Sequence, residues 1–224
     1  CGPFPNLIPV AIDGQLTTER AIESQFPATD QFTYPVNGSN SYQVPSMEPH
    51  IWVPDMEKAQ KNAGLGQVVI GSFQPTVEQR STREDLVESS FNTAQMIQST
   101  GVKVANLNTS CPNEGNNKLL CFDIDTTVDV VDAARKGLGP DIALMVKIAN
   151  FPDPFLYEEF VKRVGPKVDA IIGINTVPSR VIDPESSEQF FPGEGRVISG
   201  FSGDCIRDLS LGMLRRTVYL RQKF

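Results

Sequence analysis

Metal-binding and disulfide patterns are what this sequence lacks most clearly. It contains one histidine and four cysteines among 224 residues. The spacings of Cys1, Cys111, Cys121 and Cys205 match no zinc site and include no CxxC pair. Four cysteines could form two disulfides, but no feature of the sequence indicates a secreted protein. We therefore expect no bound metal, reduced thiols and a cytoplasmic location.

The sequence also lacks an excess of positive charge and any long hydrophobic run. Its formal net charge is −7, so no basic surface is available to bind nucleic acid or an anionic membrane. The longest apolar runs are too short to cross a bilayer. No Walker motif occurs, and no GxGxxG follows a hydrophobic run. These absences disfavour a dinucleotide-binding doubly wound sheet and leave a small molecule as the expected substrate.

The sequence divides into two parts that differ in the periodicity of their hydrophobic residues. Residues 1–55 show no clear periodicity and are rich in Pro, Asn, Ser and Gln, with one short strand expected in residues 7–12. We interpret this portion as loops and turns, either an active-site lid or the edge of a domain. We treat residues 1–224 as a single, partial barrel domain.

From residue 55 onward, hydrophobic runs alternate with segments of helical periodicity. A capping box of Ser81 and Glu84 is expected to begin the first of these helices. The alternation predicts an α/β fold with parallel strands, most simply part of a (β/α)8 TIM-type barrel that is incomplete in this chain. The expected strands are 67–73, 102–107, 142–148 and 168–174, and the expected helices are 81–101, 126–136, 155–164 and 206–218.

Polar residues cluster where these strands end. Gly71-Ser72, the run from Asn108 to Asn113, Lys147 and Asn175-Thr176 each lie at or just beyond the end of a strand, and the glycine-rich segment 199–203 is expected to be a turn. In a barrel all these positions meet at one mouth. Carboxamides both donate and accept hydrogen bonds, which suits a flat heterocycle. Cys111 beside them could act as a base or nucleophile.

Four of these motifs resemble the dihydroorotate dehydrogenase family, in its order and at about its spacing. They are Asn108-Thr109-Ser110-Cys111-Pro112-Asn113, Val146-Lys147-Ile148, Ile174-Asn175-Thr176 and Ser199-Gly200-Phe201-Ser202-Gly203. Residues 40–45 also resemble the family's substrate loop, Asn-Ser-x-Gly-x-Pro. The resemblance spans residues 36–212.

The resemblance implies a flavin enzyme that oxidises dihydroorotate to orotate in pyrimidine biosynthesis, with FMN over the barrel mouth. Cys111 would be the base that removes the C5 proton while hydride leaves C6 for the flavin. Lys147 would stabilise negative charge at the flavin N1/O2 edge. The residues that would bind the pyrimidine ring and its carboxylate are Asn40, Asn108, Asn113, Asn175 and Thr176. Ile174 and Gly200 would contact the cofactor through their backbones.

A cysteine at the base position is typical of the family's soluble, cytosolic class. Residues 117–123 lack the glycine-rich form of the NAD-linked, iron–sulfur-partnered subclass. They are closer to the homodimeric subclass that passes electrons to fumarate. A homodimer with fumarate as electron acceptor is therefore expected.

The sequence departs from the family pattern at defined places. No clear counterpart of the family's first strand precedes Gln15, and Thr17-Thr18-Glu19-Arg20 stands where the family has a Lys-Thr pair. Gln43 and Ser199 replace family glycines. The last two family strands, whose loops hold the FMN phosphate, would follow Phe224.

Other interpretations remain open. The chain could be a non-catalytic barrel remnant that binds a pyrimidine-like ligand or a partner subunit, or a different FMN oxidoreductase related to dihydropyrimidine dehydrogenase. Cys111 could be a small buried residue, and Lys147 could extend from a strand end to solvent. Asn40, Asn175 and Thr176 could be ordinary turn residues.

Overall fold

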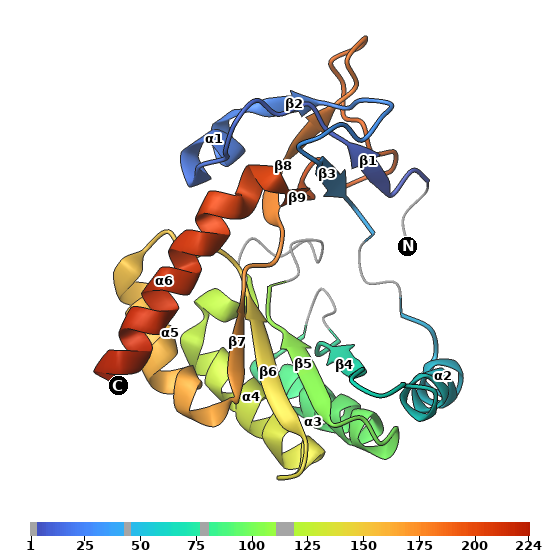
Figure 1. Ribbon diagram of the computed structural model, residues 1–224, viewed down its shortest axis with the longest axis vertical. Coiled ribbons are helices and arrows are strands. Elements are labelled where there is room, and N and C mark those ends of the chain that lie inside the picture. The colour runs from blue at the N-terminus through green and yellow to red at the C-terminus, as the bar shows by residue number, and fades with distance from the viewer. Residues whose placement is uncertain (1–3, 43–45, 77–80, 111–118) are drawn as a thin grey trace.

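The computed structural model of the chain describes residues 4–42, 46–76, 81–110 and 119–224. They form two sheets and six α-helices (Figure 1). The four-stranded sheet has the order β4-β5-β6-β7, with strands Ile70–Phe73, Val104–Asn108, Ala143–Ile148 and Ala170–Gly173. The five-stranded sheet has the order β1-β3-β9-β8-β2; in chain order its strands are Leu7–Pro9, Gln25–Pro27, Asn37–Asn40, Val177–Ile182 and Ser199–Gly203. The helices α1 to α6 are Thr18–Glu23, Pro49–Lys61, Arg83–Ser99, Ile124–Leu138, Pro154–Val164 and Arg207–Lys223.

The four-stranded sheet is wholly parallel, and its strand order follows the chain. Helices α3, α4 and α5 connect its successive strands. Sequential parallel strands joined by helices are the repeating unit of a (β/α)8 barrel. The α/β fold class and the four strands expected from the sequence are therefore confirmed, with boundaries shifted by a few residues.

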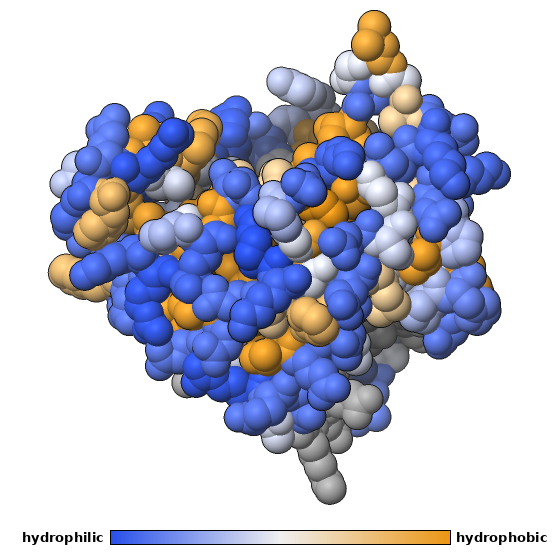
Figure 2. Space-filling view, turned by 90° about the horizontal axis from the view of Figure 1, so that it is seen from below, coloured by the Kyte–Doolittle hydropathy of each residue, from blue (hydrophilic) through white to orange (hydrophobic). Residues whose placement is uncertain are grey.

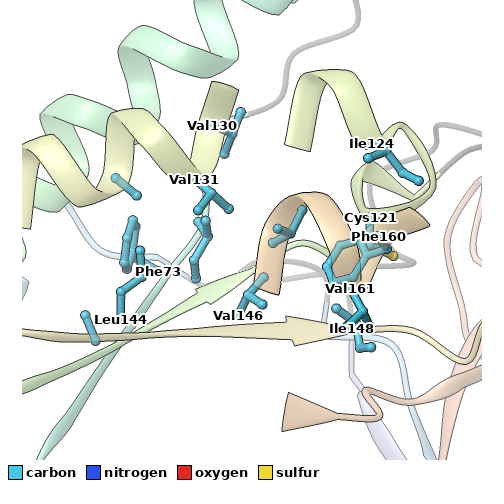
Figure 3. Close-up of a cluster of buried hydrophobic side chains, with 14 of the residues drawn as sticks. Phe73, Cys121, Ile124, Val130, Val131, Leu144, Val146, Ile148, Phe160 and Val161 are labelled. Atoms are coloured by element: carbon cyan, nitrogen blue, oxygen red, sulfur yellow. The ribbon is translucent and has the colours of Figure 1, made fainter. Parts of the chain in front are cut away.

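One face of the parallel sheet is buried against these helices. On β6, Leu144, Val146 and Ile148 are fully buried, whereas the alternate residues are only half-buried. Figure 3 shows Ile148 and Val146 of β6 on the side of Phe160 and Val161 of α5, with Leu144 further back along the strand. Since side chains of a strand alternate between its faces, the opposite face carries the residues that would line a barrel interior.

The short strand expected in residues 7–12 is confirmed as β1, but the interpretation of the rest of residues 1–55 as loops and turns was wrong. This portion contributes β1, β2 and β3 and the helix α1, and α2 begins at Pro49. The strands are only three or four residues long and rich in Pro, Gly and Asn, so periodicity had no room to appear. Pairing with distant strands stabilises them: β3 pairs with β9, and β2 pairs with β8.

Two further expectations were also wrong. Residues 199–203 form strand β9 rather than a turn, because they pair with both β3 and β8. The capping box of α3 consists of Thr82 and Asp85, one residue later than expected from the Ser81 and Glu84 pattern.

The two ends of the parallel sheet differ in what surrounds them. The five-stranded sheet lies on the side where the parallel strands end and β7 continues toward β8 (Figure 1). The opposite end of the molecule is largely hydrophilic (Figure 2). The second sheet therefore covers the end at which parallel α/β folds place their chemistry.

Candidate active site at the strand ends

The interior-facing side of the parallel sheet carries amide and ammonium side chains near the strand ends. In the register of β5 and β6, Asn108 lies opposite Lys147, and Asn106 lies opposite Met145. Lys147 and Asn108 are half-buried. Both therefore lie on the face that the helices leave uncovered, at the carboxyl end of the sheet.

Asn108 and Asn175 meet through a shared set of hydrogen bonds. The Asn175 Nδ2 atom donates to the Ser110 carbonyl at 2.7 Å and to Asn108 Oδ1 at 3.5 Å. Asn108 Oδ1 also accepts from the Ser110 backbone N–H and hydroxyl, each at 3.3 Å. These contacts join the segment after β5 to the segment after β7. Two of the predicted ring-binding amides are thus held side by side.

Lys147 lies directly beside this cluster. Its carbonyl accepts hydrogen bonds from the Thr109 backbone N–H at 3.1 Å, from the Thr109 hydroxyl at 2.9 Å and from the Ser110 hydroxyl at 3.3 Å. The chain leaving β5 therefore passes over the end of β6. The predicted base Cys111 is the next residue after Ser110, but Cys111 and Asn113 lie outside the described residues.

Asn40, Thr176 and Gly200 form a second group on the five-stranded sheet. Asn40 Nδ2 donates to the Gly200 carbonyl at 3.3 Å. A Cβ atom on Gly200 would lie 2.7 Å from Thr176 Cβ, so the two residues are in close contact. Because Thr176 directly follows Asn175, this group adjoins the Asn108 cluster.

Ile174 connects the two groups to the core. It follows β7 directly, is half-buried and packs against the hydrophobic cluster of the parallel sheet. The backbone of the next residue, Asn175, donates to the Ile148 carbonyl at 2.7 Å. The structure therefore brings Asn40, Asn108, Lys147 and the run from Ile174 to Thr176 to one end of the parallel sheet, together with Gly200.

Two polar residues at this end, Gln74 and Asn150, were not singled out from the sequence. Gln74 Oε1 accepts from Asn108 Nδ2 at 3.1 Å. Asn150 Nδ2 donates at 3.1 Å to the Thr18 hydroxyl, so the Thr17–Arg20 segment reaches the strand ends through Thr18. Gln74 and Asn150 each follow a strand by one or two residues, and this position is the signal that could have identified them.

One buried amide in the site has an unused acceptor. Asn106 is 6% exposed, and its Nδ2 atom donates to the Ser72 hydroxyl at 2.9 Å. Its Oδ1 atom has no hydrogen-bond partner among the described residues. A buried carbonyl without a donor is costly. The site has amide side chains and one lysine at the same end of the sheet, and the Asn106 Oδ1 atom lacks a donor among the described residues. This chemistry fits a planar ring bearing N–H and C=O groups, such as the isoalloxazine of a flavin.

The described cysteines do not contribute reactive thiols. Burial raises the pKa of the Cys121 thiol to about 12 and that of the Cys205 thiol to about 11. Both are free and buried. A thiol with such a high pKa is almost fully protonated near neutral pH and is a poor nucleophile.

Within the described part of the chain, no group of three or more His, Cys, Asp or Glu residues is arranged to hold a metal ion. Among the same residues, no helix combines the length and apolar character needed to span a membrane.

The likeness of this chain to a solved structure defines its fold class. The chain superimposes with a TM-score of 0.61 on the crystal structure of DHODH in complex with ferulenol from Eimeria tenella, at 17% sequence identity, over 82% of this chain and 53% of that chain. Together with the consecutive parallel strands, this likeness shows part of a (β/α)8 barrel. No family model matches the sequence.

A curated relative gives the family. The chain is 30% identical over 183 residues to a protein of Dictyostelium discoideum named dihydroorotate dehydrogenase. The match covers 77% of this chain and 46% of that protein, so the chain spans about half the length of the relative. The chain belongs to the dihydroorotate dehydrogenase family, as the motifs at the strand ends predicted. It corresponds to part of the length of a family member.

Proposed function

We propose that this chain takes part in the FMN-dependent oxidation of dihydroorotate to orotate, a step of de novo pyrimidine biosynthesis. Membership of the family supports this proposal. The observation that carries it is the meeting of Asn108, Asn175 and Lys147 around Ser110, the residue that precedes Cys111.

The reaction removes a proton from C5 and a hydride from C6 of the dihydropyrimidine ring. Cys111, as thiolate, would take the C5 proton and become a neutral thiol. FMN, when bound, would supply the two-electron acceptor for the hydride. The proton and the hydride together balance the formation of the C5=C6 double bond.

The remaining residues hold the ring and set its environment. Asn40, Asn108, Asn113, Asn175 and Thr176 would hydrogen-bond the ring carbonyls, ring N–H groups and carboxylate. The Lys147 ammonium would lie at the flavin N1/O2 edge and stabilise negative charge there. Ile174 and Gly200 would contact the cofactor through their backbones. Asn106 would find a donor for its Oδ1 atom in the same planar system.

Three further features belong to the same proposal. The enzyme would be cytoplasmic, would act as a homodimer and would pass its electrons to fumarate. Each is implied by the resemblance of the cysteine-base segment to one subclass of the family.

The test is anaerobic reduction of the purified full-length protein. Dihydroorotate should bleach the visible flavin absorbance of the parent. Cys111→Ala should slow this reduction by about 10²–10⁴-fold, the usual contribution of a general base. Cys111→Ser should be slow near neutral pH and recover as pH rises, because the serine hydroxyl has a higher pKa. Cys205→Ala is the matched control and should reduce its flavin at the parent rate.

The substrate and the alternatives are separated in the same experiment. Dihydrouracil lacks the carboxylate of dihydroorotate, so faster reduction by dihydrouracil would identify a relative of dihydropyrimidine dehydrogenase. A full-length protein that carries no flavin and does not bind orotate would be the non-catalytic remnant. Reduction of Cys111→Ala at the parent rate would remove Cys111 as the base.

A further inference from the structure

Arg196 lies in the loop between β8 and β9, within the five-stranded sheet. It is 4% exposed, although arginine is rarely buried so completely. Its guanidinium lies 5.3 Å from the centre of the Phe191 ring. Burial lowers the pKa of Arg196. The charge of a buried guanidinium requires several well-placed acceptors.

Most of those acceptors belong to two segments far away in sequence. Arg196 Nε donates to the Ser41 hydroxyl at 3.0 Å, and Nη2 donates to the Ser41 carbonyl at 2.7 Å. Nη2 also donates to Asn6 Oδ1 at 2.7 Å, and Nη1 donates to the Pro192 carbonyl at 2.7 Å. The planar guanidinium thus joins the residue after β3, the residue before β1 and its own loop.

Ser41 is held at every polar group. Arg196 binds its hydroxyl and its carbonyl, and its backbone N–H donates to the Asn6 carbonyl at 2.9 Å. Ser41 is 2% exposed and directly follows Asn40. Asn40 is fixed on its other side through Gly200, which lies four residues after Arg196.

We propose that Arg196 is a positioning residue for substrate recognition, which fixes the backbone at Ser41 so that the Asn40 amide faces the bound pyrimidine ring. This inference rests on the proposed function, because Asn40 is assigned there to the substrate. Lysine cannot replace arginine, because one ammonium group cannot reach the Ser41 hydroxyl, the Ser41 carbonyl and Asn6 in a fixed fork. Arg196 acts through Asn40 and does not itself contact the reacting atoms.

A double-mutant cycle in the full-length protein tests this route. Arg196→Lys should raise the dissociation constant of orotate about tenfold, a typical loss for hydrogen bonds of a charged group. The flavin content should stay at the parent level. In an Asn40→Ala background, Arg196→Lys should cause almost no further loss, because the two residues act in series. Arg180→Met, at an exposed arginine on β8 of the same sheet, is the control and should leave orotate affinity unchanged.

A second measurement does not depend on the function. Hydrogen exchange at residues 37–42 should accelerate in Arg196→Lys, while exchange in β5 and β6 stays at the parent rate. If the parent does not bind orotate, the proposed function fails, and exchange still decides whether Arg196 fixes this segment. Unchanged exchange at residues 37–42 would overturn the proposal. A full tenfold loss that persists in the Asn40→Ala background would overturn it as well.

Discussion

The Asn175 side-chain amide donates to the backbone carbonyl of Ser110 at 2.7 Å. This contact joins residues 65 positions apart in the sequence. It links the segment that precedes the predicted base to the end of β7. The same Nδ2 group also donates to Asn108 Oδ1, so the Asn175 side chain contacts both Ser110 and Asn108. The position of Ser110 therefore depends on a side-chain amide from the segment that follows β7.

Replacement of Asn175 should harm the site more than the fold. Asn175→Ala removes the part-buried hydrogen bond to the Ser110 carbonyl and the longer one to Asn108 Oδ1, so we expect a loss of about 1 kcal/mol in unfolding free energy. Orotate affinity should fall by at least about tenfold, because both the proposed contact with the pyrimidine ring and the support for Ser110 are lost. Chemical denaturation and orotate titration of the flavin spectrum measure the two effects. Asn92→Ala, at an exposed position on α3, is the control and should change neither.

Asn175→Asp distinguishes the donor role from simple packing. An ionised carboxylate only accepts hydrogen bonds, so it would face the Ser110 carbonyl and Asn108 Oδ1 without a proton to share. It should therefore bind orotate more weakly than Asn175→Ala does. Equal affinity of the two variants would mean that the donated hydrogen bonds contribute nothing.

Gly200 should tolerate no side chain. A Cβ atom there would lie 2.7 Å from Thr176 Cβ and 3.2 Å from Thr176 Cγ2. Gly200→Ala should therefore displace Thr176 and weaken the Asn40 contact, with a cost of about 1–3 kcal/mol for overpacking. Thermal unfolding and orotate titration should both report the loss.

The clash at Gly200 has a matched rescue. Thr176→Gly removes the atoms in the way, so the double variant should recover part of the stability lost in Gly200→Ala. Gly212→Ala is the control, because nothing lies within 4 Å of the added atom in α6. It should be neutral or stabilising by about 0.5–1 kcal/mol, as alanine favours a helix. A Gly200→Ala variant as stable as the parent would contradict the close contact.

The regular part of the chain could be predicted because its signals are local. Strand β6 and helix α5 bury runs of apolar residues whose spacing is visible in the sequence. Strands β2 and β3 show no hydrophobic spacing of this kind, because they are short and contain mostly polar residues, Gly and Pro. They are stabilised by pairing with strands more than 140 residues away. Long-range pairing of this kind cannot be read from periodicity.

The difference between local signals and long-range contacts also explains which residues of the candidate site could be predicted. Asn108 and Lys147 were predicted because each lies at the end of a hydrophobic run. Arg196 was not, since its buried position depends on Ser41 and Asn6. Because Arg196 is buried through contacts between three separate segments, the sequence of no single segment predicts its burial.

Gly137 should be as restrictive in the helical layer as Gly200 is in the site. A Cβ atom on Gly137 of α4 would lie 2.6 Å from the Phe91 carbonyl and 2.7 Å from Ala94 Cβ of α3. Gly137→Ala should separate the two helices and destabilise the protein by about 1–3 kcal/mol, although alanine is the better helix former. Thermal unfolding of this variant beside Gly212→Ala compares a packed with an open helical glycine. A stabilised Gly137→Ala would show that the helices approach less closely.

Asp169 should make the stability of the parallel sheet depend on pH. Its Oδ2 atom accepts from Arg135 Nη2 at 2.6 Å and from the Leu144 backbone N–H at 2.7 Å, at the amino end of the sheet. The hydrogen bond from Arg135 is the larger cause, and that from Leu144 the second, of the lowered pKa of Asp169. Because the pKa is lower in the folded state, the contribution to stability is fully present above the unfolded value of about 3.9.

That contribution is lost as pH falls through the pKa of folded Asp169. The thermal midpoint of Asp169→Asn should therefore lie below that of the parent at neutral pH, and the difference should shrink with acidification below about pH 4. The side chain is 55% exposed, so added salt should also reduce the difference. Asp141→Asn, at an exposed position in the turn before β6, controls for the loss of one negative charge. A difference between Asp169→Asn and the parent that stays constant from neutral to acidic pH would show that Asp169 stabilises the sheet by its shape and not by its charge.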